Sequence, residues 1–299
     1  MEIKGWKYYN HAAIPACAPH EMPDLTPIKD GTIWKIGGQH GRALLARWTE
    51  DWDCGYDTGW YYTIMDTPFD INALKAKRRY VINQGIRHFD IRTINPRQYA
   101  EELFNITRSD IEMWPEKYRP CVFLETFCKD TLSGWQNRIN SGEAVLYGAF
   151  NKETSALCGY VLVGIDNCCK EMLMVMANPK YEKLQIKAAM LNQFVQDNVS
   201  YVSNNGYISN GSKAVNHETA FNEYLEKYFG FRKAFCKLKI KYRPIVFLMV
   251  NILYPLKGML ERIDGIGIIH SVNVVLKLEE VVRTQKNYDV DKNSDEYDE

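Results

Sequence analysis

The sequence predicts an α/β protein with a mixed, largely antiparallel central sheet that is flanked by helices and preceded by a strand-rich segment. Short runs of alternating apolar residues, bounded by turn residues, are typical of strands. Longer amphipathic stretches with capping residues alternate with them and predict helices. The chain has 299 residues, 13% of them aromatic, which is enough to build a substantial core.

The first part of the chain, residues 1–66, is an aromatic-rich segment with many Gly, Trp and Pro residues. Three runs in it have strand character, at Thr32–Ile36, Ala43–Trp48 and Trp60–Met65. We expect this segment to be distinct from the rest, as a shortened first domain.

A helix is predicted next at Ile71–Gln84, with Asp70 as its N-cap and Gly85 as its C-terminal stop. The following elements are, in order, a strand at His88–Ile94, helices at Pro96–Ile106 and Tyr118–Ile139, strands at Ala144–Phe150, Leu157–Ile165 and Glu171–Ala177, a long helix at Tyr181–Val199, a strand at Tyr207–Ser209, a helix at Thr219–Phe229 and a closing strand at Lys233–Tyr242. The short links between the three successive strands predict an antiparallel meander.

These elements define one domain over 67–244, followed by amphipathic helices at 245–286 and an acidic tail at 287–299 that we expect to be disordered. The apolar run Ile245–Leu256 is about half of what a bilayer span requires. Two interpretations of 245–262 stay open: contact with a membrane interface, or packing over the end of the sheet.

Charge and cysteine content narrow the classes of function. Lys plus Arg equals Asp plus Glu, so the net charge is zero and bulk capture of DNA is not expected. The eight cysteines form no C-x-x-C pair, and the first residues contain no apolar stretch typical of a signal peptide. We therefore expect reduced thiols, no metal site of zinc-module spacing and a cytoplasmic protein, in contact with the membrane periphery if 245–262 binds lipid.

Three local motifs carry the functional signal. The first is Leu74-Lys75-Ala76-Lys77-Arg78-Arg79-Tyr80-Val81-Ile82-Asn83-Gln84-Gly85. Lys75, Arg78 and Arg79 share one helical face at i, i+3 and i+4. They predict contact with a phosphate, a carboxylate or an RNA backbone, against the alternative of a solvated charged face.

The second motif is Val175-Met176-Ala177-Asn178-Pro179-Lys180-Tyr181, leading into Ile186-Lys187-Ala188-Ala189-Met190-Leu191. The third is Tyr224-Leu225-Glu226-Lys227-Tyr228-Phe229-Gly230-Phe231-Arg232-Lys233-Ala234, in which Gly230 is predicted to stop a helix with a positive φ.

Together with the order of elements, these motifs resemble the GNAT-like N-acyltransferase fold, in the branch of the Fem-type aminoacyltransferases. In acetyl-CoA-dependent members a Gly-rich turn after Pro-x-Tyr holds the pyrophosphate of CoA. Here Glu182, Lys183, Gln185 and Lys187 stand in that turn. The resemblance therefore disfavours acetyl-CoA as donor and favours aminoacyl-tRNA, which Fem-type enzymes use.

The resemblance also concerns the catalytic acid. Many GNAT enzymes carry a Tyr five residues before the Phe that follows the closing Gly. Glu226 occupies that position here, with Tyr224 and Tyr228 on either side.

The turn after the strand at Tyr207–Ser209 is a further candidate, because ligands bind beyond strand ends in α/β sheets. His217 is the candidate base. The alternative is that Asn216 or Glu218 caps the following helix and His217 has no role in catalysis. Predicted substrate contacts are Asn210, Gly211, Ser212 and Arg232, in addition to the basic helix.

Two other clusters are weaker candidates. His11, Cys17, His20 and Glu21 have metal-ligating side chains, but the Pro-rich stretch around them predicts an extended loop. A second group of acidic residues interleaves with aromatic ones and would suit a sugar or an amine, or simply turns beside buried rings: Asp51, Asp53, Asp57, Asp66, Trp48, Trp52, Trp60, Tyr61 and Tyr62.

The sequence thus predicts an N-acyltransferase-like enzyme that moves an acyl or aminoacyl group to an amine, such as a small molecule or a glycan precursor of the cell envelope. The alternative is a catalytically silent GNAT-like fold that binds or scaffolds. The missing glycines and the displaced Tyr favour the alternative.

Overall fold

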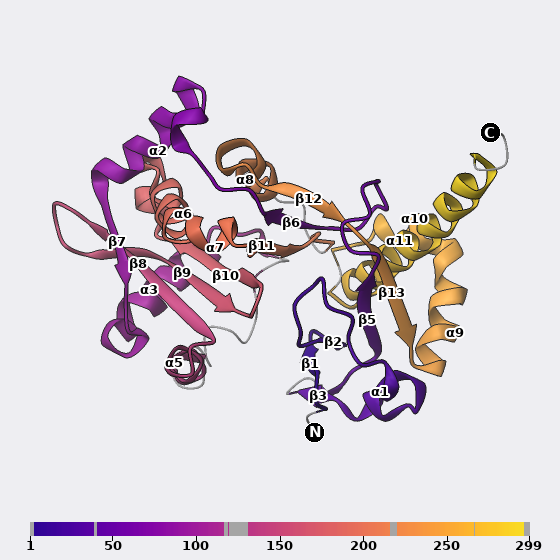
Figure 1. Cartoon of the computed structure of the whole chain (residues 1–299). Coiled ribbons are helices and arrows are strands. Elements are labelled where there is room, and N and C mark those ends of the chain that lie inside the picture. The colour runs from indigo at the N-terminus through magenta and orange to yellow at the C-terminus, as the bar shows by residue number, and fades with distance from the viewer. Residues whose placement is uncertain are drawn as a thin grey trace. The chain divides into compact units, whose positions relative to one another are not determined.

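The computed structural model describes residues 3–38, 41–116, 119, 131–215, 220–265 and 267–295 (Figure 1). Side chains are described as far as Gln285. The chain divides into two compact units. Unit 1 comprises Met1–Tyr62, Ser212–Glu218 and Lys233–Glu299, and unit 2 comprises Thr63–Gly211 and Thr219–Arg232. The boundaries differ from the predicted segments, because the closing strand region after Arg232 belongs with the N-terminal part.

Unit 2 is built on a seven-stranded sheet of order β12-β6-β11-β10-β9-β8-β7, whose first two strands and β11 run on into unit 1. The strands are β6 (Tyr61–Met65), β7 (Phe89–Thr93), β8 (Ala144–Asn151), β9 (Leu157–Ile165), β10 (Cys169–Ala177), β11 (Tyr207–Ser212) and β12 (Arg232–Phe235). Strands β8, β9 and β10 form the predicted antiparallel meander. Strand β7 pairs with β8 in the antiparallel sense, and β10 pairs with β11 in parallel. The predicted mixed, largely antiparallel sheet is confirmed.

Helices cover both faces of this sheet. They are η2 (Ile71–Ala73), α2 (Ala76–His88), η3 (Pro96–Tyr99), α3 (Ala100–Ile111), α5 (Leu132–Asn140), η6 (Pro179–Leu184), α6 (Ile186–Asp197), α7 (Val199–Ser203) and α8 (Phe221–Phe229). Neighbouring strand residues enter different cores, as the strand period requires. Tyr147 and Val161 pack with α2, α6 and α8, whereas Leu146 and Tyr160 pack with α3 and α5.

Gly85 lies inside α2 and does not end it, contrary to the prediction. The helix continues to His88, and it starts at Ala76 because Leu74 and Lys75 are extended. A Cβ on Gly85 would lie 2.4 Å from the carbonyl oxygen of Gln185 and 3.0 Å from the backbone nitrogen of Ala189. Gly85 therefore serves the close approach of α2 to α6, since any side chain would force the two helices apart.

Gln185 breaks the helix that the sequence predicts over Tyr181–Val199. Its backbone is left-handed, with φ 63° and ψ 40°, and it separates the 3₁₀ turn η6 from α6. Gly230, by contrast, behaves as predicted: it caps α8 in the left-handed conformation with φ 70°. The described part of the predicted helix Tyr118–Ile139 is α5, and residues 120–130 lie outside the described residues.

Unit 1 contains a four-stranded sheet of order β1-β2-β5-β13, with β1 (Trp6–Tyr9), β2 (Ala12–Pro15), β5 (Leu45–Glu50) and β13 (Lys237–Tyr242). Its shorter elements are α1 (Thr26–Lys29), η1 (Thr32–Lys35), β3 (Gly37–Gly38) and β4 (Gly41–Arg42). Two predictions are wrong here. The run Thr32–Ile36 is mostly a 3₁₀ turn, and Lys233–Tyr242 divides into β12 and β13, which belong to different sheets.

The C-terminal part of unit 1 is helical, as expected for 245–286. It consists of α9 (Pro244–Leu253), η7 (Tyr254–Leu256), α10 (Lys257–Glu261) and α11 (Gly267–Asp295). Helix α11 continues to Asp295, so helix replaces the predicted disorder over most of 287–299. Residues 296–299 lie outside the described residues.

The contact at Gly85 can be tested by adding one methyl group. Gly85→Ala should destabilise the protein by about 1–3 kcal/mol, because backbone atoms of α6 have little room to move. Gly134→Ala is the matched control: Gly134 lies in α5 with open space around its Cβ position, so alanine should stabilise by about 0.5–1 kcal/mol. Urea denaturation of both variants measures the effect, and equal stability of the two would contradict the close-approach account.

Candidate functional site

A cleft of about 230 Å³ opens in unit 2 between the start of α6 and helix α8. Its lining residues are Glu182, Gln185, Lys187, Phe221 and Tyr224. The cleft lies where β10 ends and the chain turns into a helix. It therefore includes the turn of the second sequence motif, where the sequence disfavours acetyl-CoA.

The wall made by η6 and α6 is fixed by local interactions. The side chain of Asn178 accepts a hydrogen bond of 3.1 Å from the backbone nitrogen of Lys180, and Pro179 begins η6. Lys187 forms an ion pair of 2.9 Å with Glu182 across the turn. Gln185 takes the left-handed conformation that glycine adopts most readily. The turn thus keeps a glycine-type backbone but fills the space with side chains.

The wall made by α8 is aromatic. The ring of Tyr224 lies 4.7 Å from that of Tyr228, 5.9 Å from Phe229 and 6.3 Å from Phe221, measured between centroids. Burial raises the pKa of the Tyr224 phenol well above its usual value, with a smaller contribution from Tyr228. Tyr224 therefore stays protonated at neutral pH and can donate a hydrogen bond.

Asp110, on α3, is an acidic group close to the same turn. It is buried, and its Oδ2 accepts a hydrogen bond of 3.0 Å from the backbone nitrogen of Ala177, the last residue of β10. Burial raises the pKa of this carboxyl, while the bond from Ala177 and the charge of Lys187 oppose the rise. Asp110 thus holds the end of β10 from which the turn departs.

Strands β10 and β11 pair over only a short distance. The register runs from Cys169 opposite Tyr207 to Glu171 opposite Ser209, although β10 continues to Ala177. The register of β10 with β9 shifts between Met172 and Met174, immediately after this pairing ends. A bulge of this kind re-aims a strand. In the described pairings, the later part of β10 pairs with β9 alone, and the N–H of its last residue, Ala177, is bonded to Asp110.

The basic residues of the first motif gather at the start of α2. Lys75 is the N-cap and is exposed, while Arg78 and Arg79 are half-buried. The guanidinium of Arg79 donates a hydrogen bond of 3.2 Å to the carbonyl oxygen of Asn72. The first turn of α2 contains no acidic residue. The N-terminal end of a helix carries a partial positive charge, so cations placed there are repelled by it. A bound anion would offset both positive charges, and this arrangement therefore favours one.

The predicted substrate contacts after β11 fall in different settings. Asn210 donates a hydrogen bond of 2.8 Å to Asn222 on α8, which ties the strand end to the aromatic wall. Gly211 has φ 81° and donates its N–H to the hydroxyl of Ser209, and Ser212 is the last residue of β11. The predicted base, His217, lies outside the described residues.

Arg232 is engaged within unit 2. Its Nε lies 3.1 Å from both carboxylate oxygens of Asp66, and its Nη2 bonds to Asp66 as well. This two-pronged pair joins the start of β12 to the residue after β6. The ion pair gives Arg232 a structural role. The predicted contact of Arg232 with substrate stays a prediction.

The two weaker clusters do not assemble into sites. Among the described residues, no group of three or more His, Cys, Asp and Glu side chains is placed to hold a metal. Asp57 accepts a bond of 2.7 Å from the N–H of Gly59 in a turn, and Asp51 pairs with Lys237 at 2.9 Å. The acidic residues beside the aromatics therefore fit turns and ion pairs.

Sequence reasoning missed Tyr224 and Asp110 as site residues. Tyr224 is named only as a neighbour of Glu226, because a family spacing says nothing about which side of α8 faces the cleft. Asp110 lies beyond the predicted end of its helix at Ile106. The extension of α3 to Ile111 is what brings its carboxyl to β10. The available signal was the spacing: Asp110 follows Leu103 by seven residues and Ile106 by four, which places it on the buried face of α3.

No family model and no curated protein matches the sequence. Several solved structures are similar at low identity. L-PGS from Bacillus licheniformis is 14% identical, with a TM-score of 0.46 over 83% of this chain and 83% of that one. FemX is 10% identical, with a TM-score of 0.49 over 78% of this chain and 83% of its own. PaiA N-acetyltransferase from Thermoplasma acidophilum, in complex with coenzyme A, is 21% identical, with a TM-score of 0.31 over 36% of this chain and 72% of its own.

Likenesses at this level say nothing about the activity of the chain. The fold is nevertheless GNAT-like by its own connectivity: β7 is followed by α3 and α5, the meander β8–β10, α6, β11, α8 and β12. This is the order implied by the sequence resemblance.

The buried carboxyl of Asp110 predicts a pH dependence of stability. Because the folded-state pKa lies above the unfolded value of about 3.9, stability from this group is complete below that pH and is lost as pH rises through the folded pKa. Asp110→Asn does not titrate and keeps an oxygen for the Ala177 N–H. We expect it to gain stability relative to the parent as pH rises from 3 to 8.

Urea denaturation across that pH range is the measurement, with Glu101→Gln on the exposed side of α3 as the control. Asp110→Ala should instead lose about 1–3 kcal/mol at every pH, because the Ala177 N–H loses its partner. If the free energy of unfolding of Asp110→Asn changes with pH in the same way as that of the parent, the folded structure does not disfavour the ionised form of this carboxyl.

Proposed function

We propose that unit 2 is an acyltransferase domain that transfers an acyl or aminoacyl group to an amine. The observation that carries the proposal is the cleft beyond β10, bounded on one side by Lys187 at the start of α6 and on the other by Tyr224 of α8. A cation and a helix start suit an anionic donor. The protonated phenol of Tyr224, on the other side of the cleft, could give a proton to the leaving group of the reaction.

The reaction needs positioning more than covalent chemistry. The acceptor amine attacks the carbonyl carbon of the donor, and the carbonyl oxygen takes up negative charge. Backbone N–H groups of β10 beyond Glu171, where its described pairing with β11 ends, would stabilise that charge. Collapse of the tetrahedral species breaks the bond to the leaving oxygen, and Tyr224 protonates that oxygen. A base removes the proton of the amine, and His217 remains the proposed base.

The donor is proposed to be an aminoacyl-tRNA and not acetyl-CoA. Glu182 lies in the turn and pairs with Lys187, so it sets a negative charge where a CoA pyrophosphate would bind. Gln185 adds a side chain in a turn that CoA-type binding needs to be bare. The cations at the start of α2 provide a second anion-binding surface in the same unit, which suits a polyanionic donor.

The acceptor is proposed to be a primary amine of a small molecule or a glycan precursor of the cell envelope, met on the cytoplasmic side. This step rests on the sequence resemblance to Fem-type enzymes.

A second candidate function is binding or scaffolding without catalysis. The ion pair between Lys187 and Glu182 favours it, because the cation of the proposed donor site already has a partner.

Replacing one hydroxyl in the cleft separates the two functions. We expect amine acylation from aminoacyl-tRNA with the parent and little from acetyl-CoA. Tyr224→Phe should lower kcat about a hundredfold or more with little change in KM, since a general acid contributes roughly 10²–10⁴. Tyr228→Phe, on the same helix with its ring centroid 4.7 Å from that of Tyr224, is the control and should keep most activity. A parent that turns over no donor but binds one would support the scaffold.

The basic start of α2 makes a separate prediction. Arg78→Ala and Arg79→Ala should each weaken binding of aminoacyl-tRNA roughly tenfold, because a charge-assisted hydrogen bond contributes about 1.5–3 kcal/mol. Filter binding at two salt concentrations measures this, and thermal melting should change little. Arg87→Ala, exposed at the other end of α2, is the matched control.

If binding and melting both stay unchanged in Arg78→Ala and Arg79→Ala, the face is merely solvated. If melting falls while binding holds, the arginines are structural, and their place in the donor site is wrong.

A further inference from the structure

The C-terminal part of unit 1 presents a long apolar surface to solvent. From Pro244 to Leu256 the sequence contains no charged residue. The stretch Pro244–Glu261, which spans α9, η7 and α10, has a mean hydropathy of 1.3 and is only 6% buried. Helices this apolar are normally enclosed in a core. The exposure of this one therefore requires a partner.

One stripe of the stretch already has a partner within unit 1. Val250 is buried, and Val246, Leu253 and Tyr254 share its cluster, which also contains Leu45 of β5, Tyr242 of β13 and Leu276 of α11. The spacing of four and three residues between these positions places them on one face of the helix. The stretch is thus anchored to the core of unit 1.

Among the described residues, the opposite stripe has no such cover. Ile245 is 69% exposed, Leu248 59%, Ile252 60% and Met259 57%, and Met249 and Leu256 lie between them. Within α9, the exposed residues Ile245, Leu248, Met249 and Ile252 recur at intervals of three and four, so they share one face, and Leu256 and Met259 continue the exposed apolar surface beyond it. A contiguous exposed apolar face of this kind marks an interaction surface.

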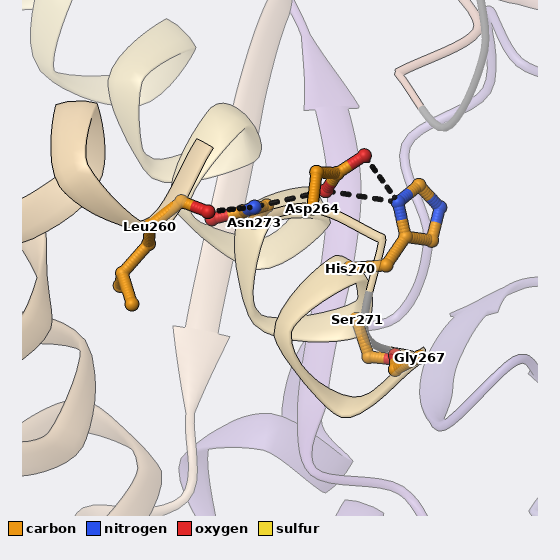
Figure 2. Close-up of polar contacts among 6 residues, drawn as sticks. All are labelled: Leu260, Asp264, Gly267, His270, Ser271 and Asn273. Atoms are coloured by element: carbon orange, nitrogen blue, oxygen red, sulfur yellow. Dashed lines mark hydrogen bonds and ion pairs between the residues drawn. The ribbon is translucent and has the colours of Figure 1, made fainter. Parts of the chain in front are cut away.

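The stretch is held in place at its C-terminal end by polar contacts (Figure 2). Asn273 of α11 donates hydrogen bonds of 3.0 Å to the carbonyl oxygen of Leu260 and 2.8 Å to Asp264. The ring of His270 lies 3.0 Å from the same carboxylate. Lys257 pairs with Glu280 of α11 and, at 3.5 Å, with Glu261. These contacts hold α10 against α11, so the position of the apolar face on unit 1 is fixed.

Charge around the stretch identifies the partner. The sequence from Lys241 to Arg262 has four cations and a single anion, Glu261. Two of these cations are engaged within unit 1, because Arg243 bonds to the carbonyl oxygen of Trp34 and Lys257 pairs with Glu280. Lys241 and Arg262 are exposed, one before the apolar face and one after it. Cations that flank an apolar face match the phosphates of lipid headgroups, which lie directly outside the acyl region.

We propose that the exposed face of Pro244–Glu261 inserts into the interface of an anionic membrane, with the helix axis in the membrane plane. The helix does not cross the bilayer, because Val250 and its neighbours would have to leave their own core and the ion pairs of Lys257 would break. This inference stands independently of the proposed acyl transfer.

The test is flotation of the full chain with vesicles of phosphatidylcholine alone and with phosphatidylglycerol added. We expect binding to the anionic vesicles, weaker binding to the neutral ones, and loss of the difference at high salt. The double variant Leu248→Ser/Ile252→Ser should bind at least tenfold more weakly, because two apolar side chains no longer enter the interface. Met22→Ser, also exposed in unit 1 but outside the stretch, is the matched control and should bind like the parent.

Three outcomes would overturn the proposal. Vesicle binding that the double variant retains would place the contact elsewhere. A parent that ignores vesicles but is a dimer, made monomeric by the double variant, would assign the face to a second copy. Resistance of the vesicle-bound chain to extraction with alkaline carbonate would indicate a helix that spans the bilayer.

Discussion

The close approach of α2 to α6 at Gly85 is the constraint on which the candidate site depends. It brings the backbone of α2 against Gln185, the residue that ends η6 and begins α6. That contact fixes the angle at which α6 leaves β10, and so the opening of the cleft towards Tyr224. It also fixes α2, whose first turn carries the basic residues. One missing side chain thus sets both proposed anion-binding surfaces of unit 2.

Around that contact the turn before α6 combines a glycine-type backbone with charged side chains. The left-handed backbone at Gln185 is kept, while Glu182 and Lys187 close on each other in front of it. Asp110 holds the strand end behind the turn at the cost of a buried carboxyl. The electrostatic character of the cleft is therefore set by side chains on the turn and not by bare amides.

Much of the fold was accessible from the sequence, because the strands of the meander alternate clearly and are joined by short links; β9 was predicted to the residue. The sequence did not predict the helix break at Gln185 or the position of Gly85 inside α2. Both depend on the close approach of these two residues across the fold, which no local sequence pattern encodes. The division of Lys233–Tyr242 at Cys236 also escaped, since both halves have the same strand character. Among the proposed site residues, the basic residues of α2 were predicted from their spacing in the sequence and stay a prediction, whereas Tyr224 and Asp110 could be proposed only from the packing of α8 and α3.

The central claim is that the turn at the start of α6 and helix α8 form one ligand site. Hydrogen–deuterium exchange of the full chain, with and without aminoacyl-tRNA, tests it directly. We expect slower exchange on binding in the amides of 186–189 and 221–229, on the two walls of the cleft, and at the start of α2. Protection confined to α2, or to unit 1, would contradict the claim that this cleft is where the donor binds.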